Sequence, residues 1–307
     1  MNLRKTVSTN RRDVSLLGDF SRGPIPWLAP LAIVLLLTFI YPTFEVFRYS
    51  FTDMSILKNT YSYTLKSFRQ VFLNSDTYTI LKNTFVFVVF SVVFQTLLGF
   101  LIAQAVDKGE TLGLKGTVAV RVISLLSWAI PGIIIGVVWS FLYNETGTGI
   151  LVFILSKVGI KNATFLTDPK HALACTVVAN VWRGTAQSMI LTYAGLKTVP
   201  KDIVEAASID GANAFHRLIH VILPSIFSVI STNIVLNTIN TFNTFDMIIS
   251  LTGGGPGRAT EVLAMTSYTT IFSGHSLGRG SAYAVLLLVI NSCMAVIYFI
   301  LLKRKEK

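Results

Sequence analysis

Polar side chains follow one face of a long apolar segment in the last third of the chain. Residues 221–247 place amide and hydroxyl groups at i, i+4, i+7 and i+11, which is one face of a helix, at Asn233, Asn237, Asn240 and Thr244. Because polar groups avoid lipid, such a stripe in a membrane either hydrogen-bonds to another helix or lines a wet path. Amides and hydroxyls suit an uncharged polar solute such as a sugar, on whose ring the nearby Phe242 and Phe245 could stack.

A single arginine, Arg183, interrupts another apolar segment, residues 171–196. A charged group in such a segment is costly to bury, so it either marks a functional site or pairs with an opposite charge or a backbone carbonyl. Asp246 is the carboxylate that the sequence offers as a partner. The sequence leaves both interpretations open, a site and a structural tie.

Residue patterns typical of catalysis or metal binding are absent from the sequence. The four histidines lack HExxH-like spacing, and the two cysteines, Cys175 and Cys293, lie far apart in apolar stretches. The sequence also lacks a GxxxxGKS/T phosphate loop, a TVGYG-like filter and any Asp or Glu in the middle of an apolar segment. We therefore expect a chain that is not an enzyme, binds no metal or cofactor itself and takes the energy for any uphill transport from a partner.

The composition is that of an integral membrane protein. Of the 307 residues, 52% are hydrophobic and only 13% are charged, whereas soluble domains carry about 25% charged residues. The mean hydropathy is +0.63. The net charge of +11 is explained by basic flanks on the cytoplasmic side of a membrane, so we expect no nucleic-acid partner.

The spacing of charged residues predicts an all-α protein with six transmembrane helices. Each candidate has about the 20 apolar residues that a bilayer requires, and Arg183 makes the fourth the most polar. The third candidate contains Pro131, Gly132 and Gly136, which predict a close helix contact with a kink, or alternatively a gating hinge. The six candidates are residues 27–44, 83–106, 122–143, 171–196, 221–247 and 281–302.

The distribution of Lys and Arg predicts that both termini face the cytoplasm. Under this assignment the segments on the cytoplasmic side of the membrane hold 15 of the 26 basic residues in about 70 positions, and those on the outer side hold 10 in about 98 positions. The predicted parts are a cytoplasmic tail (1–26), a transmembrane domain (27–302) and a basic cytoplasmic tail (303–307). The segments predicted to lie outside are 45–82, 144–170 and 248–280.

The cytoplasmic loop of residues 197–224 predicts two short helices joined by a glycine turn. Pro200 suits the start of a helix, Gly211 suits the left-handed residue that ends it, and Asn213 suits the cap of the next. The second helix has Phe215, Leu218, Ile219 and Ile222 on one face. Such a compact helical projection fits a groove of another protein, although an ordinary helical loop is the simpler interpretation.

This loop resembles the EAA motif of binding-protein-dependent ABC importer permeases. The pattern EAA, three residues, Gly, nine residues, Ile, one residue, Leu-Pro matches at every spacing, with Val221 in the position of Ile. Asp210 and Ala212 extend the match. The segment from Leu251 to Pro256, with the sequence LTGGGP, is similar to carbohydrate permeases of the maltose-permease first-subunit type.

The resemblance implies the type I ABC importer permease fold and a loop that couples to ATPase subunits. It implies a partner assembly of a second, different permease subunit, two ABC ATPases that use ATP and Mg, and an extracytoplasmic solute-binding protein, in a bacterial or archaeal cell membrane. The implied ATPase contacts are Glu205, Ala206, Ala207, Asp210, Gly211, Ala212, Phe215, Leu223 and Pro224.

The function that follows from these features is passage of a sugar or oligosaccharide through the membrane. The candidate substrate-path residues are Asn233, Asn237, Asn240, Thr244, Phe245 and Arg183. Alternatives are an sn-glycerol-3-phosphate permease of the same family, for which Arg183 is the one intramembrane cation, and a channel or structural subunit without coupled transport. A membrane enzyme is disfavoured because no cluster of reactive side chains is present.

Overall fold

The computed structural model describes residues 25–58, 60–146, 149–160 and 163–305. Within them the regular structure is helical, apart from one isolated β-bridge between Thr52 and Tyr63. The chain forms two compact units, Met1–Arg48 and Tyr49–Lys307. Of the predicted tails, residues 1–24 and 306–307 lie outside the described residues.

The N-terminal helix contains the first predicted span. It consists of α2 (Ile25–Leu35), a π-helical turn (Leu36–Ile40) and α3 (Tyr41–Ser50). Residues Trp27–Ser50 are long and apolar enough to cross a membrane. Near the end of this helix, Arg48 pairs with Glu45 at 2.6 Å between Nη2 and Oε2, which offsets two charges that would be costly next to lipid.

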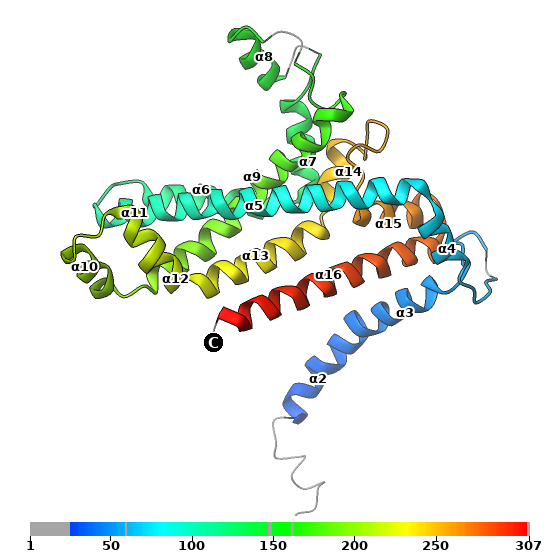
Figure 1. The fold of residues 1–307 in the computed structure, drawn as a ribbon. Coiled ribbons are helices and arrows are strands. Elements are labelled where there is room, and N and C mark those ends of the chain that lie inside the picture. Colours follow the sequence, from blue (N-terminus) through cyan, green and yellow to red (C-terminus); the bar gives the residue numbers. More distant parts are fainter. Residues whose placement is uncertain (1–24, 59, 147–148, 161–162, 306–307) are drawn as a thin grey trace, which may run out of the picture. The chain divides into compact units, whose positions relative to one another are not determined.

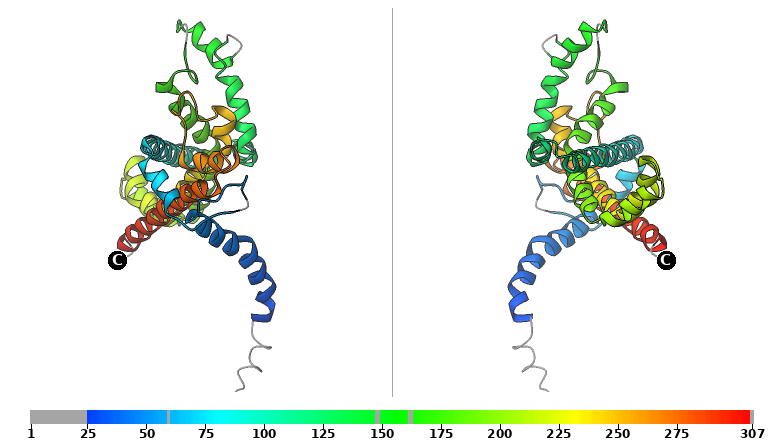
Figure 2. Two further views of the ribbon diagram at one scale, coloured as in Figure 1. Left: turned by 90° about the vertical axis from the view of Figure 1, so that its right-hand side faces the viewer. Right: turned by 90° about the vertical axis from the view of Figure 1, so that its left-hand side faces the viewer.

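The second unit is built on four long helices, α5, α9, α13 and α16. The helix α5 packs along α9, and α13 packs against α5, α9 and α16 (Figure 1). The helices α7 and α8 extend away from these four to one side (Figure 2). In chain order the elements are α4 (Lys66–Leu73), α5 (Ser75–Thr111), α6 (Thr117–Ala129), α7 (Gly132–Leu142), α8 (Ile150–Lys157), α9 (Pro169–Lys197), α10 (Lys201–Ile209), α11 (Ala214–Arg217), η2 (Leu218–Ile222), α12 (Leu223–Ser225), α13 (Phe227–Phe242), α14 (Asp246–Leu251), α15 (Leu263–Phe272) and α16 (Leu277–Lys305).

Up to five of the six predicted spans qualify by length and composition, if each bent helix pair is counted as one span. Among the described residues, three helices qualify singly, and two bent pairs, α6–α7 and α11–α12 with α13, bring the number to five. The remaining predicted span coincides with α9, which has 29 residues but is not among these candidates. Because α9 packs against α5, α6 and α13, many of its side chains face protein and need not be apolar.

The third predicted span is broken rather than kinked. The helices α6 and α7 meet at 103°, and Ile130 between them is extended, with ψ of 129°. The proline that follows explains this, since it disfavours helical geometry in the residue before it and has no N–H to donate. The predicted close contact at Gly136 is confirmed, because a Cβ there would collide with the Ser250 hydroxyl and the Met247 carbonyl of α14.

The prediction of one continuous helix over 221–247 is wrong at both ends. The chain turns by 71° at Ile226, and α13 ends at Phe242, so Thr244 lies in a link rather than on the helix. Side chains compete for the last carbonyls of α13: Asn243 donates to the Ile239 carbonyl at 2.8 Å and Thr244 to the Asn240 carbonyl at 3.0 Å. Asp246 therefore begins α14 instead of ending the span.

The LTGGGP segment folds into a compact loop against the start of α5. Gly253 and Gly254 have φ values of 62° and 88°, which glycine adopts without strain. The hydroxyl groups of Thr252 and Thr260 lie 2.7 Å apart. Asn83 of α5 donates to the Arg258 carbonyl at 3.0 Å, so this loop is fixed to the end of α5 that is remote from the 197–224 loop (Figure 1).

A single carboxylate organises the segment between α7 and α9. Glu145 accepts hydrogen bonds from the backbone N–H groups of Phe165 and Leu166, each at 2.7 Å, and from the N–H and hydroxyl of Thr167. Partial burial raises the pKa of Glu145, but these hydrogen bonds outweigh that effect and hold the pKa below its usual value. The carboxylate therefore stays ionised and keeps residues 165–167 close to the end of α7.

Glycines allow α5 and α9 to approach closely. A Cβ at Gly99 would collide with the Ser188 side chain and would lie 2.7 Å from the Met189 backbone nitrogen. A Cβ at Gly184 of α9 would collide with the Gln95 side-chain amide. The contact between the two helices thus depends on positions where any larger residue would force them apart.

Substituting Gly99→Leu is expected to separate α5 from α9 and to lower the free energy of unfolding by roughly 1–3 kcal/mol or more. Ala105→Leu is the matched control, because Ala105 lies on the exposed side of the same helix. Thermal unfolding in detergent, followed by circular dichroism, measures both variants. Equal unfolding temperatures would contradict the importance of this contact.

Candidate functional site

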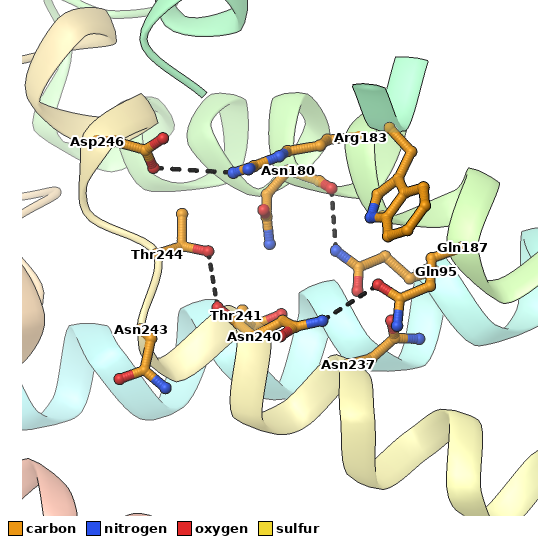
Figure 3. A pocket seen from close by; sticks show the side chains of 12 residues that line it. Gln95, Asn180, Arg183, Gln187, Asn237, Asn240, Thr241, Asn243, Thr244 and Asp246 are labelled. Atoms are coloured by element: carbon orange, nitrogen blue, oxygen red, sulfur yellow. Dashed lines mark hydrogen bonds and ion pairs between the residues drawn. The ribbon is translucent and has the colours of Figure 1, made fainter. Parts of the chain in front are cut away.

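A polar cavity of about 310 Å³ lies between the middle parts of α5 and α9 and the C-terminal end of α13. Its lining is dominated by amide and hydroxyl groups, with one aromatic side chain and one pair of opposite charges (Figure 3). A site of this composition inside an apolar helical bundle can accommodate a polar solute. The lining residues are Gln95, Trp128, Asn180, Arg183, Gly184, Gln187, Asn237, Asn240, Thr241, Asn243, Thr244 and Asp246.

Hydrogen bonds orient the amides of the cavity. The Gln95 side-chain amide donates to the backbone carbonyl of Asn180 at 2.9 Å, and the Asn240 side-chain amide donates to the Gln187 side-chain oxygen at 3.1 Å (Figure 3). The side-chain nitrogen of Asn180 is buried and has no hydrogen-bond partner among the described residues. Since an amide has two donors and an acceptor, these groups retain capacity to bind a hydroxylated solute.

The predicted asparagine stripe divides into a structural half and a half that faces the cavity. Asn233 is fully buried and its side-chain oxygen accepts hydrogen bonds from Ser188 at 3.3 Å and from Asn237 at 3.2 Å. Asn233 therefore joins α13 to α9 and does not line the cavity. Asn237 both hydrogen-bonds to Ser188 and Asn233 and lines the cavity. Asn240 and Thr244 line the cavity.

The two charged residues of the cavity face each other. The Arg183 Nη1 and Asp246 Oδ1 atoms are 3.7 Å apart, which agrees with the predicted possibility of an ion pair. Asp246 also lies against the first residue of α7, because a Cβ at Gly132 would collide with its carboxylate. The pair thus joins α9 to the start of α14, next to the break between α6 and α7.

The aromatic residues expected to stack on a solute lie elsewhere. Phe242 is buried and contacts Phe85 edge-on at 5.9 Å between ring centroids. Phe245 stacks on Tyr268 at 5.0 Å and packs against the hydrophobic core, so neither residue lines the cavity. The aromatic side chain that does so is Trp128, near the end of α6.

Several lining residues were not predicted from the sequence. On α9, Asn180 and Gln187 flank Arg183 at i, i+3 and i+7, and this spacing would have identified a second polar face. Gln95 is one of three amides on α5, with Asn83 and Gln104, and carries a weaker signal. Thr241 lies four residues after Asn237 on α13, on the face of the predicted stripe. Trp128 and Asn243 line the cavity without any distinctive spacing in the sequence.

The 197–224 loop has the local structure that its sequence predicts. Pro200 precedes α10, which runs from Lys201 to Ile209, and Gly211 has φ of 81°. The Asn213 side chain accepts a hydrogen bond from the His216 backbone N–H at 2.8 Å and caps α11. A short helix, a glycine turn and a second helix are therefore confirmed.

The surface of this loop is largely unburied. Phe215 and Ile209 are 70% and 87% exposed. Ala207 and Ala212 are half-buried and line a hollow of about 490 Å³ together with Asp210 and Gly211. The other motif residues are Glu205, Ala206 and Pro224, which are exposed, and Leu223, which is half-buried.

A charged network fixes the base of the loop to the bundle. Lys197, the last residue of α9, contacts Asp107 at 2.7 Å and Glu110 at 2.9 Å, both on α5. Arg121 of α6 pairs with Glu110 at 3.1 Å, and the Tyr193 hydroxyl donates to Glu110 at 2.6 Å. Hydrogen bonds to the two carboxylates raise the pKa of Lys197, so the lysine stays charged and the network joins the ends of α5, α6 and α9.

The fold is that of a multi-pass, all-helical membrane protein, and a polar cavity lies among its helices. Residues 95–307 match the family described as the binding-protein-dependent transport system inner membrane component, and the chain belongs to this family. It is the permease subunit of a binding-protein-dependent ABC importer, a non-catalytic component of the inner membrane that binds no cofactor, while the partner ATPase uses ATP.

Relatives with named substrates align over nearly the whole chain. The trehalose/maltose transport system permease protein of Thermococcus litoralis is 33% identical over 275 residues, covering 88% of this chain and 90% of that protein. The sulfoquinovosyl glycerol transport system permease protein of Agrobacterium fabrum is 28% identical and covers 91% and 90%. The sn-glycerol-3-phosphate transport system permease protein of Brucella abortus is 29% identical and covers 89% and 92%.

A solved structure has the same fold. The match is to a chain in the crystal structure of a bacterial ABC transporter involved in the import of the acidic polysaccharide alginate. The TM-score is 0.82 at 21% sequence identity, and the alignment covers 95% of this chain and 99% of that one. The predicted importer-permease fold is therefore confirmed.

The different burial of two stripe residues predicts different effects of the same substitution. Asn233→Leu is expected to destabilise the protein by about 1–3 kcal/mol, because it removes the acceptor of two buried donors. Asn240→Leu should leave stability nearly unchanged, since Asn240 is exposed to the cavity. Thermal unfolding of the two variants in detergent makes the comparison, and equal destabilisation would refute the division of the stripe.

Proposed function

We propose that this permease subunit carries a neutral sugar or oligosaccharide. The observation that carries the proposal is the cavity between α5, α9 and α13, whose lining is rich in amides and hydroxyls and whose two charges offset each other. Sugars present many hydroxyl groups that both donate and accept, and amides match them in both roles. The name of one relative, the trehalose/maltose transport system permease protein, is consistent with a neutral sugar as solute.

Within this proposal, Asn237, Asn240, Thr244 and Arg183 form part of the solute path. The first three supply amide and hydroxyl groups, and Trp128 supplies the apolar face on which a sugar ring can stack. The earlier candidates Asn233 and Phe245 act indirectly, by holding α13 against α9 and the link after α13 against the core.

sn-Glycerol 3-phosphate is the second candidate solute. Arg183 lies at the cavity and is a suitable partner for a phosphate, and relatives of similar identity are named for this solute. The carboxylate of Asp246 opposes this choice, because it would repel the phosphate at the same place. A neutral solute avoids that repulsion.

The 197–224 loop is proposed to dock on an ATPase subunit on the cytoplasmic side. Its exposed Phe215 and Ile209, and the hollow lined by small residues beside Gly211, suit an interface with another protein. The proposed assembly contains this chain, a second and different permease subunit, two ATPases and an extracytoplasmic binding protein. Both termini face the cytoplasm in this arrangement, and residues 45–82, 144–170 and 248–280 face outward.

Transport in this assembly proceeds by alternating access. The binding protein and the ATPases each favour one of two arrangements of the helices, and solute enters or leaves according to which prevails. In this chain α9 carries Arg183 at the cavity and Lys197 at the base of the loop, so one rigid helix connects the two sites. The breaks at Pro131 and Ile226 are natural places for the remaining helices to move.

Glu205→Lys is expected to abolish stimulation of ATP hydrolysis by liganded binding protein, because it reverses a charge on the proposed docking surface. The assay uses the complete complex in lipid nanodiscs. Ser208→Ala is the matched control, an exposed position on the same helix, and it should retain stimulation. Full stimulation of the Glu205→Lys complex would contradict the docking role, and uptake without any ATP requirement would favour a channel.

Asn240→Leu is expected to reduce sugar uptake by roughly tenfold, the effect of losing one or two hydrogen bonds to the solute. Uptake is measured in proteoliposomes that contain the complete transporter with ATP inside. Thr232→Val, at an exposed position of α13 outside the cavity, should transport normally. Unchanged uptake by the Asn240→Leu transporter would exclude this residue from the path.

A further inference from the structure

The cavity contains one cation and one anion among otherwise uncharged lining residues. These are Arg183 of α9 and Asp246 of α14, which are 28% and 33% exposed. Their charges cancel in the cavity as a whole. Any solute that enters therefore meets either a neutral site or, if the pair separates, two opposite charges.

The pair is looser than other ion pairs of the same chain. Its closest nitrogen–oxygen distance is 3.7 Å, whereas Lys197 and Asp107 approach to 2.7 Å. A charge-assisted hydrogen bond is typically about 2.7–2.9 Å long. Arg183 thus has its charge balanced by Asp246 without having its N–H groups saturated by it, and these groups remain available at the cavity.

Asp246 has electrostatic support that does not depend on Arg183. Its carboxylate lies against Gly132, the first residue of α7. The N-terminal turn of a helix carries a partial positive charge that favours an anion. The two members of the pair are therefore unequal: the carboxylate has a second stabilising neighbour, whereas Arg183 depends on Asp246 for its charge balance.

We propose that Asp246 is a specificity-determining residue that masks Arg183 and so restricts the cavity to uncharged solutes. The inference rests on the proposed carbohydrate function and deepens it. A phosphorylated or carboxylated sugar approaching Arg183 is repelled by Asp246, whereas a neutral sugar accepts hydrogen bonds from the free N–H groups of the guanidinium. Removal of the carboxylate alone converts the cavity into an anion site.

The test compares binding of trehalose and trehalose 6-phosphate to the complete complex in nanodiscs without binding protein, so that only the cavity selects. Calorimetric titration is expected to show at least roughly tenfold tighter binding of trehalose 6-phosphate to Asp246→Asn than to the wild type, the effect of an unmasked charge-assisted hydrogen bond. The ratio of the trehalose 6-phosphate affinity to the trehalose affinity should rise by at least roughly tenfold, whatever the substitution does to trehalose binding itself. The gain should shrink at high salt and vanish in the Asp246→Asn, Arg183→Gln double variant.

The reverse substitution gives an independent measurement if Asp246→Asn does not assemble. Arg183→Gln leaves the carboxylate unmasked, so the cavity should bind the cationic sugar glucosamine at least roughly tenfold more tightly than the wild type does. A pair that only ties α9 to α14 would lower thermal stability in both single variants without changing charge preference. Unchanged charge preference, or a gain that persists in the double variant, would overturn the proposal.

Failure of the carbohydrate assignment is distinguishable from failure of this inference. The assignment fails if wild-type proteoliposomes with binding protein take up sn-glycerol 3-phosphate and no neutral sugar. The inference fails if the wild type takes up a neutral sugar but the variants show no charge-dependent shift in binding. The first result concerns the wild-type transporter alone, and the second depends on the comparison with the variants.

Discussion

The need to satisfy polar groups away from lipid determines how the helices of this permease are arranged. α9 is too polar to qualify as a membrane span by composition, yet it packs against α5, α6 and α13. Gly99 and Gly184 allow it to approach α5, and Asn233 binds it to α13. The same requirement that places this helix inside the bundle also places its remaining polar side chains at one cavity.

This arrangement links the cavity to the 197–224 loop through a single helix. Arg183 lies near the middle of α9, and Lys197 at its end is held by carboxylates of α5. In the proposed mechanism, this continuous helix would transmit a shift of the loop to the cavity wall. The helices broken at Pro131 and Ile226 are the proposed places at which the other side of the cavity adjusts.

The sequence predicts the parts of this fold that depend on local interactions. The turn at Gly211 and the cap at Asn213 follow from backbone preferences of single residues, and five helical segments follow from hydropathy. The sharp turn at Ile226 and the end of α13 before Thr244 do not. The end of α13 coincides with hydrogen bonds from the Asn243 and Thr244 side chains to carbonyls of the same helix, which the hydropathy pattern does not reveal. The asparagine stripe is visible in the sequence. Its division between packing and cavity is not, because it depends on contacts of α13 with α9, which is distant in the sequence.

The most direct test of the account is the accessibility of the loop in the working complex. A Phe215→Cys variant, with Cys175 and Cys293 replaced by serine, is treated with a water-soluble maleimide as the isolated subunit and as the complete ATP-hydrolysing transporter. The account predicts rapid labelling of the isolated subunit, where Phe215 is 70% exposed, and strong protection in the complex. Equal labelling in both states would show that no motor subunit covers the loop and would contradict the proposed coupling.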